Sequence, residues 1–384
     1  MKLETLSLTL LSILPVVGCT TSAAPITDDS VTTSDVTAND ANRGSHTVYT
    51  LSNVASGNAV LAFHRRADGS LVAATTTATG GLGSDDALGS QGALAFAFDG
   101  HVLLAVNPGS NDVSSFLVDG AHLYLLSRVS SGGTRPISVA AHDGLVYVLN
   151  AGASTSVSGL YLDWFGRLHP LSGSTTAVGA GPAQVSFSPD GHSLVVTEKA
   201  TNRIDTFSVG YGGRLHDNMA VDSAGQTPFG FAFTSRGQLV VSEAAGGAPG
   251  AGSVSSYELV GNVSRHADLI TGPVADEQSA PCWIVITRDD RFAYASNTAS
   301  GTISGYTVAP HGELTLFDDG GATAETGEGS KPIDMALDRR SRRLYVLGAG
   351  SHDIQELEVE DDGSLAATGV SVGVPATSVG LLAR

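Results

Sequence analysis

Two glutamates stand at the same point of two apolar runs. Glu198 ends the run in LVVTEKATNR, and Glu243 ends the run in LVVSEAAGGA. A carboxylate in a cavity can act as a general base on water, and two neighbouring carboxylates can share a proton or a cation. Glu198 and Glu243 are therefore candidate catalytic residues, provided that the fold brings the two strand ends together.

Further polar residues lie near the beginnings and ends of apolar runs in the chain. The candidate ligand-binding residues are Arg135, Gln184, Lys199, Trp283, Asn297, Lys331 and Asp334. Mixed charges and one indole around a cavity would suit a polar ligand. The alternative is structural: Asn often occupies the place of the two glutamates, and Asn or Glu there can bond the backbone of its own loop.

The usual catalytic and metal-binding motifs are absent or misplaced. The chain has no His-Glu-x-x-His or Cys-x-x-Cys motif, and its Gly-x-Ser-x-Gly match at residues 369–373 lies in an alternating stretch that predicts a strand and not a nucleophile elbow, so the common hydrolase and zinc templates receive no support. We expect neither a cofactor nor a metal ion. Cys282 is expected to be a small buried apolar residue and not a nucleophile.

A repeat of about 50 residues positions these groups. Its marker is a glycine followed within a few residues by Leu or another apolar residue, at Gly69, Gly120, Gly166, Gly213, Gly261, Gly312 and Gly363. Short alternating strands and Asp-Gly turns surround each marker, which is typical of antiparallel hairpins. A period of this length belongs to propellers or solenoids. We predict an all-β, seven-bladed β-propeller of four-stranded antiparallel blades, because a solenoid would need polar end caps and none is visible.

The two ends of the repeat region fit a closed ring. The region begins at Val48 with the second strand of a unit and ends in SVGLLAR, residues 378–384, with an unpaired inner strand. We expect this C-terminal strand to complete the first blade. Prolines recur in phase before the inner strands, at positions 136, 182, 228, 281, 332 and 375. Glu198 and Glu243 then lie in neighbouring blades on one face, at the mouth of a central channel.

The N-terminus resembles an export signal. Residues 1–18 hold Lys2 and an apolar stretch too short to span a bilayer, and VVGC resembles a lipobox ending at Cys19. We expect a signal peptide at 1–18, lipidation of Cys19, a disordered tether at 19–45 and the propeller at 46–384. A secretory signal cut near Ala23 or Ala24 is the alternative. The expected location is the cell envelope, as an outer-membrane or periplasmic lipoprotein, or else secretion.

The charge limits the partners. A net charge of −18 with no basic block argues against nucleic acid and anionic lipid surfaces. We expect a monomer that meets the membrane only through an N-terminal lipid. The expected partner is a small polar molecule.

The repeats resemble the lactonase family of seven-bladed propellers, which includes 6-phosphogluconolactonase and carboxymuconate cyclase-like enzymes. The resemblance rests on VSFSPDGHSLVVTEKATNRIDTFSV, FAYASNTASGTISGYTVAPHGELTL and IDMALDRRSRRLYVLGAGSHDIQELEVEDDGSL, and covers residues 46–384. It implies a propeller and lactone hydrolysis, and it makes Arg203 in TNRI the match to a basic family residue and a third candidate catalytic group. The other family positions differ, because Gln184 replaces a His, Cys282-Trp283 replaces an Arg-His pair, and Thr298 replaces a Glu.

Two functional hypotheses follow from these residues. In the first, Glu198 or Glu243 is the general base of a lactone hydrolase, and Arg135, Lys199 or Arg203 stabilises the oxyanion. In the second, the chain is a non-catalytic envelope propeller that binds a small ligand or a protein.

Overall fold

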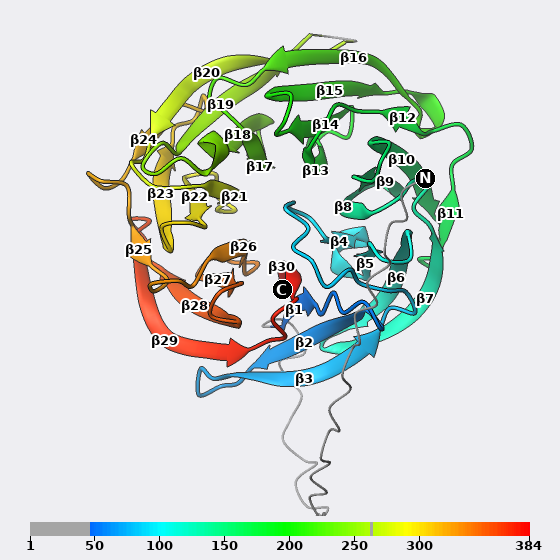
Figure 1. Ribbon diagram of the computed structural model, residues 1–384, viewed down its shortest axis with the longest axis horizontal. Helices are drawn as coiled ribbons and strands as arrows, with labels where there is room; N and C mark the ends of the chain where they lie inside the picture. Colours follow the sequence, from blue (N-terminus) through cyan, green and yellow to red (C-terminus); the bar gives the residue numbers. More distant parts are fainter. Residues whose placement is uncertain (1–46, 262–263) are drawn as a thin grey trace, which may run out of the picture. The chain divides into compact units, whose positions relative to one another are not determined.

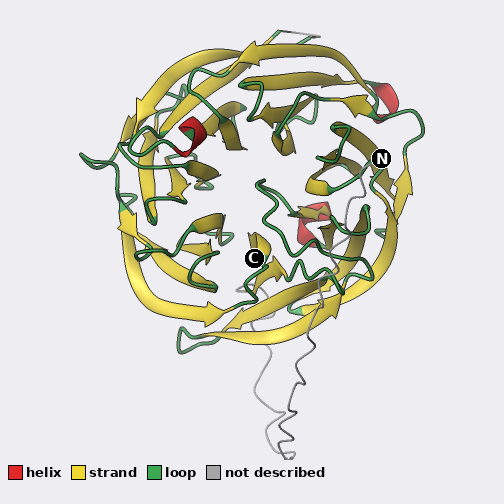
Figure 2. Cartoon of the chain, viewed as in Figure 1, coloured by secondary structure: helices red, strands yellow, loops and turns green. Residues whose placement is uncertain are grey.

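The repeats fold into seven antiparallel sheets arranged around one axis (Figure 1), and β-strands account for nearly all of the regular structure (Figure 2). The computed structural model describes residues 47–261 and 264–384. The predicted signal peptide, the lipidation site Cys19 and the tether lie outside these residues. Among the described residues, no helix has the length and apolar character needed to cross a bilayer.

We number the blades along the chain and give their strands from the axis outward. Blade 1 contains β30 (Val379–Ala383), β1 (Thr47–Leu51), β2 (Ala59–Arg65) and β3 (Leu71–Ala78). Blade 2 contains β4 (Leu94–Ala97), β5 (Val102–Asn107), β6 (Asp112–Asp119) and β7 (His122–Ser130). Blade 3 contains β8 (Pro136–His142), β9 (Leu145–Asn150), β10 (Ser156–Leu162) and, both pairing with β10, β11 (Leu168–Pro170) and β12 (Thr176–Ala177).

The remaining blades repeat this order. Blade 4 contains β13 (Pro182–Phe187), β14 (Ser193–Glu198), β15 (Arg203–Val209) and β16 (Leu215–Asp222). Blade 5 contains β17 (Pro228–Phe233), β18 (Gln238–Glu243), β19 (Ser253–Val260) and β20 (His266–Ala275). Blade 6 contains β21 (Pro281–Ile286), β22 (Phe292–Asn297), β23 (Thr302–Val308), β24 (Leu314–Leu316) and β25 (Ala324–Glu325). Blade 7 contains β26 (Pro332–Leu337), β27 (Arg343–Gly348), β28 (Asp353–Val359) and β29 (Leu365–Gly373).

The second strand of each blade explains the apolar runs in the sequence. All six residues of β14 and of β22 are buried, because neighbouring blades cover both faces of these strands. The outer strand β16 is exposed at five of its eight positions. A run such as LVV therefore marks a second strand, and the residue that ends it lies at the edge of the sheet.

A tyrosine on the second strand joins several neighbouring blades. The hydroxyl of Tyr147 in blade 3 donates to the carbonyl of Gly213 in blade 4 at 2.8 Å, and Tyr294 in blade 6 does the same to Gly363 in blade 7 at 2.8 Å. Both glycines have positive φ, 78° and 91°, in the turn between the third and fourth strands. The glycine that marks each repeat thus permits a tight turn that reaches the preceding blade.

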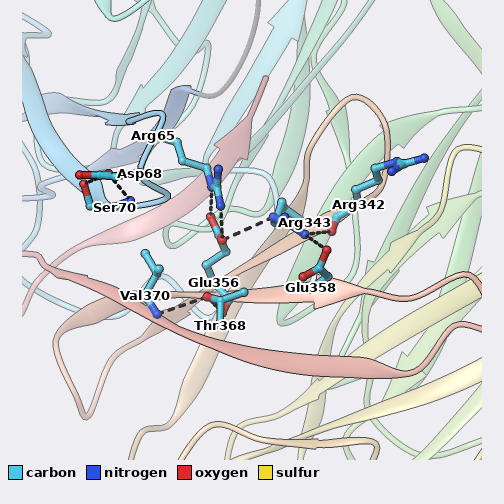
Figure 3. A network of polar contacts seen from close by, with 9 residues as sticks. All are labelled: Arg65, Asp68, Ser70, Arg342, Arg343, Glu356, Glu358, Thr368 and Val370. Atoms are coloured by element: carbon cyan, nitrogen blue, oxygen red, sulfur yellow. Dashed lines mark hydrogen bonds and ion pairs between the residues drawn. The ribbon is translucent and has the colours of Figure 1, made fainter.

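The ring closes as the sequence predicts. Strand β30 pairs with β1 in antiparallel register, with Val48 opposite Ala383. Across the joint between blades 1 and 7, the Arg65 guanidinium binds the Glu356 carboxylate, and Arg343 lies on the other side of the same carboxylate (Figure 3). Closure thus completes blade 1 with its fourth strand, and the inner strands keep only short edges that face the axis.

The loops of the propeller form two faces. We call the face that holds the loops after the second strands and the segments before the inner strands the upper face. The turns between inner and second strands form the lower face. Five inner strands begin at the predicted prolines, at positions 136, 182, 228, 281 and 332.

Candidate functional site

Glu198 ends strand β14 and is buried within blade 4. Its side chain lies between the second strand and the segment that leads into β13, where it accepts hydrogen bonds from the backbone N–H of Gly179 and, at 2.5 Å, from the Thr201 hydroxyl. Only 2% of the residue is exposed. The carboxylate is therefore directed into its own blade and not toward the axis.

Glu243 occupies the same position in blade 5 and is completely buried. It accepts hydrogen bonds from the Gly225 N–H at 2.7 Å, the Ser253 hydroxyl at 2.7 Å and the Ser223 hydroxyl at 3.1 Å. The hydroxyl of Tyr257 donates at 3.3 Å, and burial together with the nearby carboxylate raises the pKa of this tyrosine. Four donors thus surround one carboxylate that water does not reach.

Asn fills this position in other blades and makes comparable contacts. Asn107 donates to the Ser114 hydroxyl at 2.9 Å, and Asn297 donates to the Ser304 hydroxyl at 2.8 Å. A glycine of the incoming segment packs closely on the side chain in both kinds of blade: a Cβ at Gly81 would lie 2.4 Å from the Asn107 side chain, and one at Gly179 would lie 2.0 Å from Glu198. The Asn or Glu side chain at the end of the second strand therefore binds the incoming segment to its own blade.

Asp205 is a carboxyl group that sequence reasoning missed. It lies on β15, 4% exposed, and interacts with Glu198. Burial, followed by the charge of Glu198 and a hydrogen bond to it, raises the pKa of Asp205 to about 7. The signal was available, because Ser114 and Ser304 stand seven residues after their Asn and Asp205 stands seven residues after Glu198.

Three other predicted residues lie apart from the axis or at its rim. Arg203 begins the third strand β15, where its Nε lies 3.8 Å from the exposed Asp222 carboxylate. Asn297 is fully buried in blade 6. Lys331 is exposed just before β26, with a φ of 50°. Arg203 stands opposite Glu198 in the register of β14 and β15, whereas Asn297 and Lys331 belong to blades 6 and 7 and not to the blades of the two glutamates.

Arg135, Lys199 and Trp283 do converge, at the upper mouth of the axial channel. They meet residues 84–92, part of the segment that leads into β4 and reaches toward the axis (Figure 1). The Trp283 indole N–H donates to the Ser90 carbonyl at 3.1 Å, Lys199 donates to the Gly89 carbonyl, and Arg135 donates to the Ala87 carbonyl at 3.4 Å. We call residues 84–92 the plug segment.

The plug segment is fixed to the inner strands of two other blades. The Gln91 side chain donates to the Ile284 carbonyl at 2.8 Å and accepts from the Ile284 N–H at 3.1 Å. The Gln91 N–H also donates to the Ala183 carbonyl at 3.2 Å. These bonds join blades 4 and 6 through one residue.

The polar groups under the plug segment are strongly shielded from water. The Lys199 ammonium lies 4.6 Å from the ring centre of Phe229, which in turn lies 5.0 Å from Trp283. Burial lowers the pKa of Lys199 and raises the pKa of Cys282 to about 11. The thiol is protonated at neutral pH, as expected for a structural cysteine.

Gln184 and Asp334 lie lower in the channel and line a cavity of about 550 Å³. Gln184 bridges two blades, because its amide donates to the Phe231 carbonyl at 2.9 Å and accepts from the Phe231 N–H at 2.7 Å. Burial raises the pKa of Asp334 well above the ordinary range, partly offset by the N–H groups of Met335 and Leu381. The plug segment contributes Gln91 and Gly92 to the same cavity.

The plug segment itself was not predicted. Its length is the signal that sequence reasoning passed over, because 15 residues separate β3 from β4 whereas five separate β7 from β8. A longer connection in an otherwise regular repeat has enough chain to reach the axis.

Comparison with known proteins supports the fold and the family. A family model described as "Lactonase, 7-bladed beta-propeller" matches residues 165–245 and 251–379, more than half of the chain. No curated protein matches the sequence. A putative 6-phosphogluconolactonase from Bacteroides fragilis is 19% identical, with a TM-score of 0.71 over 90% of this chain and 100% of that one.

Two further solved structures share the architecture. A putative 6-phosphogluconolactonase from Bacteroides uniformis is 20% identical, with a TM-score of 0.68 over 88% of this chain and 99% of that one. The periplasmic gluconolactonase PpgL from Pseudomonas aeruginosa is 19% identical, with a TM-score of 0.65 over 86% of this chain and 97% of that one. At these identities the solved structures establish only that the fold is shared. The family is established by the match to the family model. The chain belongs to the lactonase family of seven-bladed β-propellers.

Proposed function

We propose that this lactonase-family propeller binds a polar, oxygen-rich small molecule outside the cytoplasm and does not hydrolyse lactones through Glu198 or Glu243. The observation that carries the proposal is the set of three side-chain donors, from Arg135, Lys199 and Trp283, aimed at carbonyl oxygens of the plug segment. A lactone or a sugar acid presents the same acceptor oxygens. Such a ligand would replace the backbone carbonyls at these donors.

The burial of the two glutamates argues against their acting as bases. A general base must lie within hydrogen-bond reach of the water that it activates. Glu198 and Glu243 are 2% and 0% exposed, and their oxygens already accept hydrogen bonds from their own loops. Arg203 lies on a third strand and faces Asp222. A hydrolytic mechanism built on these residues would need the two carboxylates to give up their loop hydrogen bonds and become accessible to solvent.

Lactone hydrolysis by other groups is the second candidate function. It is favoured by membership of the lactonase family and by the structural likeness to the Pseudomonas aeruginosa protein, a periplasmic gluconolactonase. The periplasmic location of that protein and the signal-like N-terminus of this chain also support a location outside the cytoplasm.

The fluorescence of Trp283 can measure ligand binding independently of hydrolysis. Trp164 is 99% exposed and Trp283 is 5% exposed, so a Trp164→Phe protein reports on the upper mouth alone. We expect gluconate and glucono-δ-lactone to change Trp283 fluorescence, and Lys199→Met to weaken this effect at least tenfold. Arg167→Met, which removes an exposed charge from a lower turn, is the control.

The same samples test catalysis. We expect lactone turnover to stay far below an ordinary enzymic kcat/KM of about 10⁴ M⁻¹s⁻¹. Turnover at or above that value would overturn the proposal in favour of a hydrolase. Loss of that turnover in a Glu198→Gln, Glu243→Gln protein would assign it to the two glutamates.

A further inference from the structure

The wall of the axial cavity combines a band of apolar side chains with polar groups such as Gln184 and Asp334. Half-buried apolar side chains line it from the inner strands of five blades, among them Ala95, Ala141, Ala232, Val285 and Leu382. Apolar surface in contact with water is unfavourable in proportion to its area, and an apolar ligand of suitable width would remove that contact. The volume of about 550 Å³ falls within the range of small-molecule sites. We call this cavity the shaft.

The shaft is closed at one end and open at the other. Gln91 and Gly92 of the plug segment line its upper end. At its lower end it continues into a hollow of about 920 Å³ on the lower face, with which it shares Phe96, Ile286 and Leu337. A ligand would therefore enter from the lower face and place its inner end below the plug segment.

Arginines stand at the lower opening without carboxylate partners. Arg288 and Arg339 line the hollow, and among the described residues neither forms an ion pair. Arg288 donates to the Arg339 carbonyl at 3.4 Å, and Arg339 donates to the Asp99 carbonyl at 2.9 Å. These backbone bonds fix the direction of both side chains and leave most of their five N–H donors unused.

The carboxyl groups of the hollow compete little for these arginines. Asp338 is 7% exposed and accepts from the N–H groups of Arg340 and Arg342, at 3.0 and 2.9 Å, within its own turn. Asp143 stands on a turn of blade 3 with 95% of its side chain exposed, where water screens its charge. Asp99 is also exposed, on the neighbouring turn of blade 2.

We propose that the shaft binds an aliphatic monocarboxylate through its lower opening. The carboxylate accepts hydrogen bonds from Arg288 and Arg339, whose planar guanidinium groups suit two-point binding of a carboxylate. The alkyl chain lies against the apolar side chains of the inner strands and ends near Gln91. This site is separate from the donors at the upper mouth, and it uses neither Lys199 nor Trp283.

Calorimetric titration with three probes tests the proposal. Decanoate has the head group and the chain, acetate has only the head group, and decyltrimethylammonium has the chain with the opposite charge. We expect decanoate to bind at least tenfold more tightly than either of the other two. Equal binding of decyltrimethylammonium would show that the arginines do not select the ligand, and equal binding of acetate would show that the shaft is unused. Either result overturns the proposal.

Variants locate the site. Arg288→Gln with Arg339→Gln is expected to weaken decanoate binding at least tenfold, and Arg167→Gln on another lower turn serves as a control for the loss of a surface arginine charge. Ala232→Phe fills the shaft and is expected to abolish binding, and Ala95→Leu is a smaller filling change if the first variant fails to fold. Decanoate binding that survives both the double arginine variant and a folded filling variant would overturn the proposal.

Discussion

Arg65 and Glu356, 291 residues apart in the chain, form a two-point ion pair across the joint between the first and last blades, with Nε to Oε2 at 2.7 Å and Nη2 to Oε1 at 3.2 Å. The Glu356 side chain is fully buried, and the Arg65 side chain is 20% exposed. Arg343 approaches the same carboxylate at 3.5 Å. The pair therefore supports ring closure together with the pairing of β30 and β1 (Figure 3).

Removal of the arginine is expected to destabilise the ring. Arg65→Met leaves the buried Glu356 carboxylate with a single, longer contact to Arg343. Breaking a buried pair from one side costs about 3 kcal/mol of unfolding free energy. Chemical denaturation of the purified propeller measures this loss.

An exposed ion pair provides the control for this variant. Arg203→Gln removes a pair whose side chains are 44% and 89% exposed, and it is expected to cost less than about 1 kcal/mol. Equal losses of unfolding free energy in Arg65→Met and Arg203→Gln would contradict the claim that the ion pair between blades 1 and 7 stabilises ring closure.

The Asp205 carboxyl predicts a dependence of stability on pH. The native state holds this proton to a pKa of about 7, whereas the unfolded chain releases it near the ordinary aspartate value of 3.8. The native state therefore binds more protons between these values, and the free energy of unfolding falls as pH rises from about 4 to about 7, by up to about 1.4 kcal/mol per pH unit.

Asp205→Asn removes this titration. The variant is expected to flatten the profile and to be more stable than the wild type at a pH of about 7.5, above the raised pKa, measured by thermal unfolding at several pH values. Asp222→Asn changes an 89% exposed carboxylate in the same blade and is the control. An unchanged slope in Asp205→Asn would assign the pH dependence to other groups.

The backbone conformation just before the inner strands predicts that two reciprocal substitutions differ in their effect on the melting temperature. Gly181 has a φ of 66°, and Ala280 holds the equivalent place with a φ of 57°. A side chain in this left-handed region costs about 1 to 2 kcal/mol, and a Cβ at Gly181 would lie 3.0 Å from that of Ala200. Gly181→Ala should therefore lower the melting temperature, whereas Ala280→Gly should leave it unchanged or raise it.

The plug segment is expected to open when Gln91 is shortened. Gln91→Ala removes both side-chain bonds to Ile284 in blade 6. In a Trp164→Phe background, acrylamide should then quench Trp283 more strongly than in the parent. Gln226→Ala changes a glutamine of another incoming segment and is the control. Quenching that is equal in both proteins would mean that Gln91 does not hold the segment in place.

The sequence predicted the fold in detail because the fold depends on local patterns. Seven glycine turns, in-phase prolines and apolar second strands each follow from short-range chemistry, and the unpaired strand at residues 378–384 predicted the closure. The position of Glu198 and Glu243 at the ends of second strands was also predictable. Their direction was not, because it depends on the N–H groups of Gly179 and Gly225 in a separate segment.

At the upper mouth, too, the sequence predicted the position of side chains but not their contacts. The convergence of Arg135, Lys199 and Trp283 follows from the phase of the repeat. The plug segment that meets them depends on one irregular connection, and no repeat pattern describes its path. Likewise, Glu198 helps to raise the pKa of Asp205 through a diagonal contact between β14 and β15, which becomes visible only once the strand register is known.

A crystal structure of the full chain soaked with gluconate tests the central claim most directly. We predict gluconate oxygens at the Lys199 and Trp283 nitrogens, with the plug segment displaced from its carbonyl contacts. Gluconate bound at Glu198 or Glu243, or an upper mouth unchanged at saturating gluconate, would contradict the account.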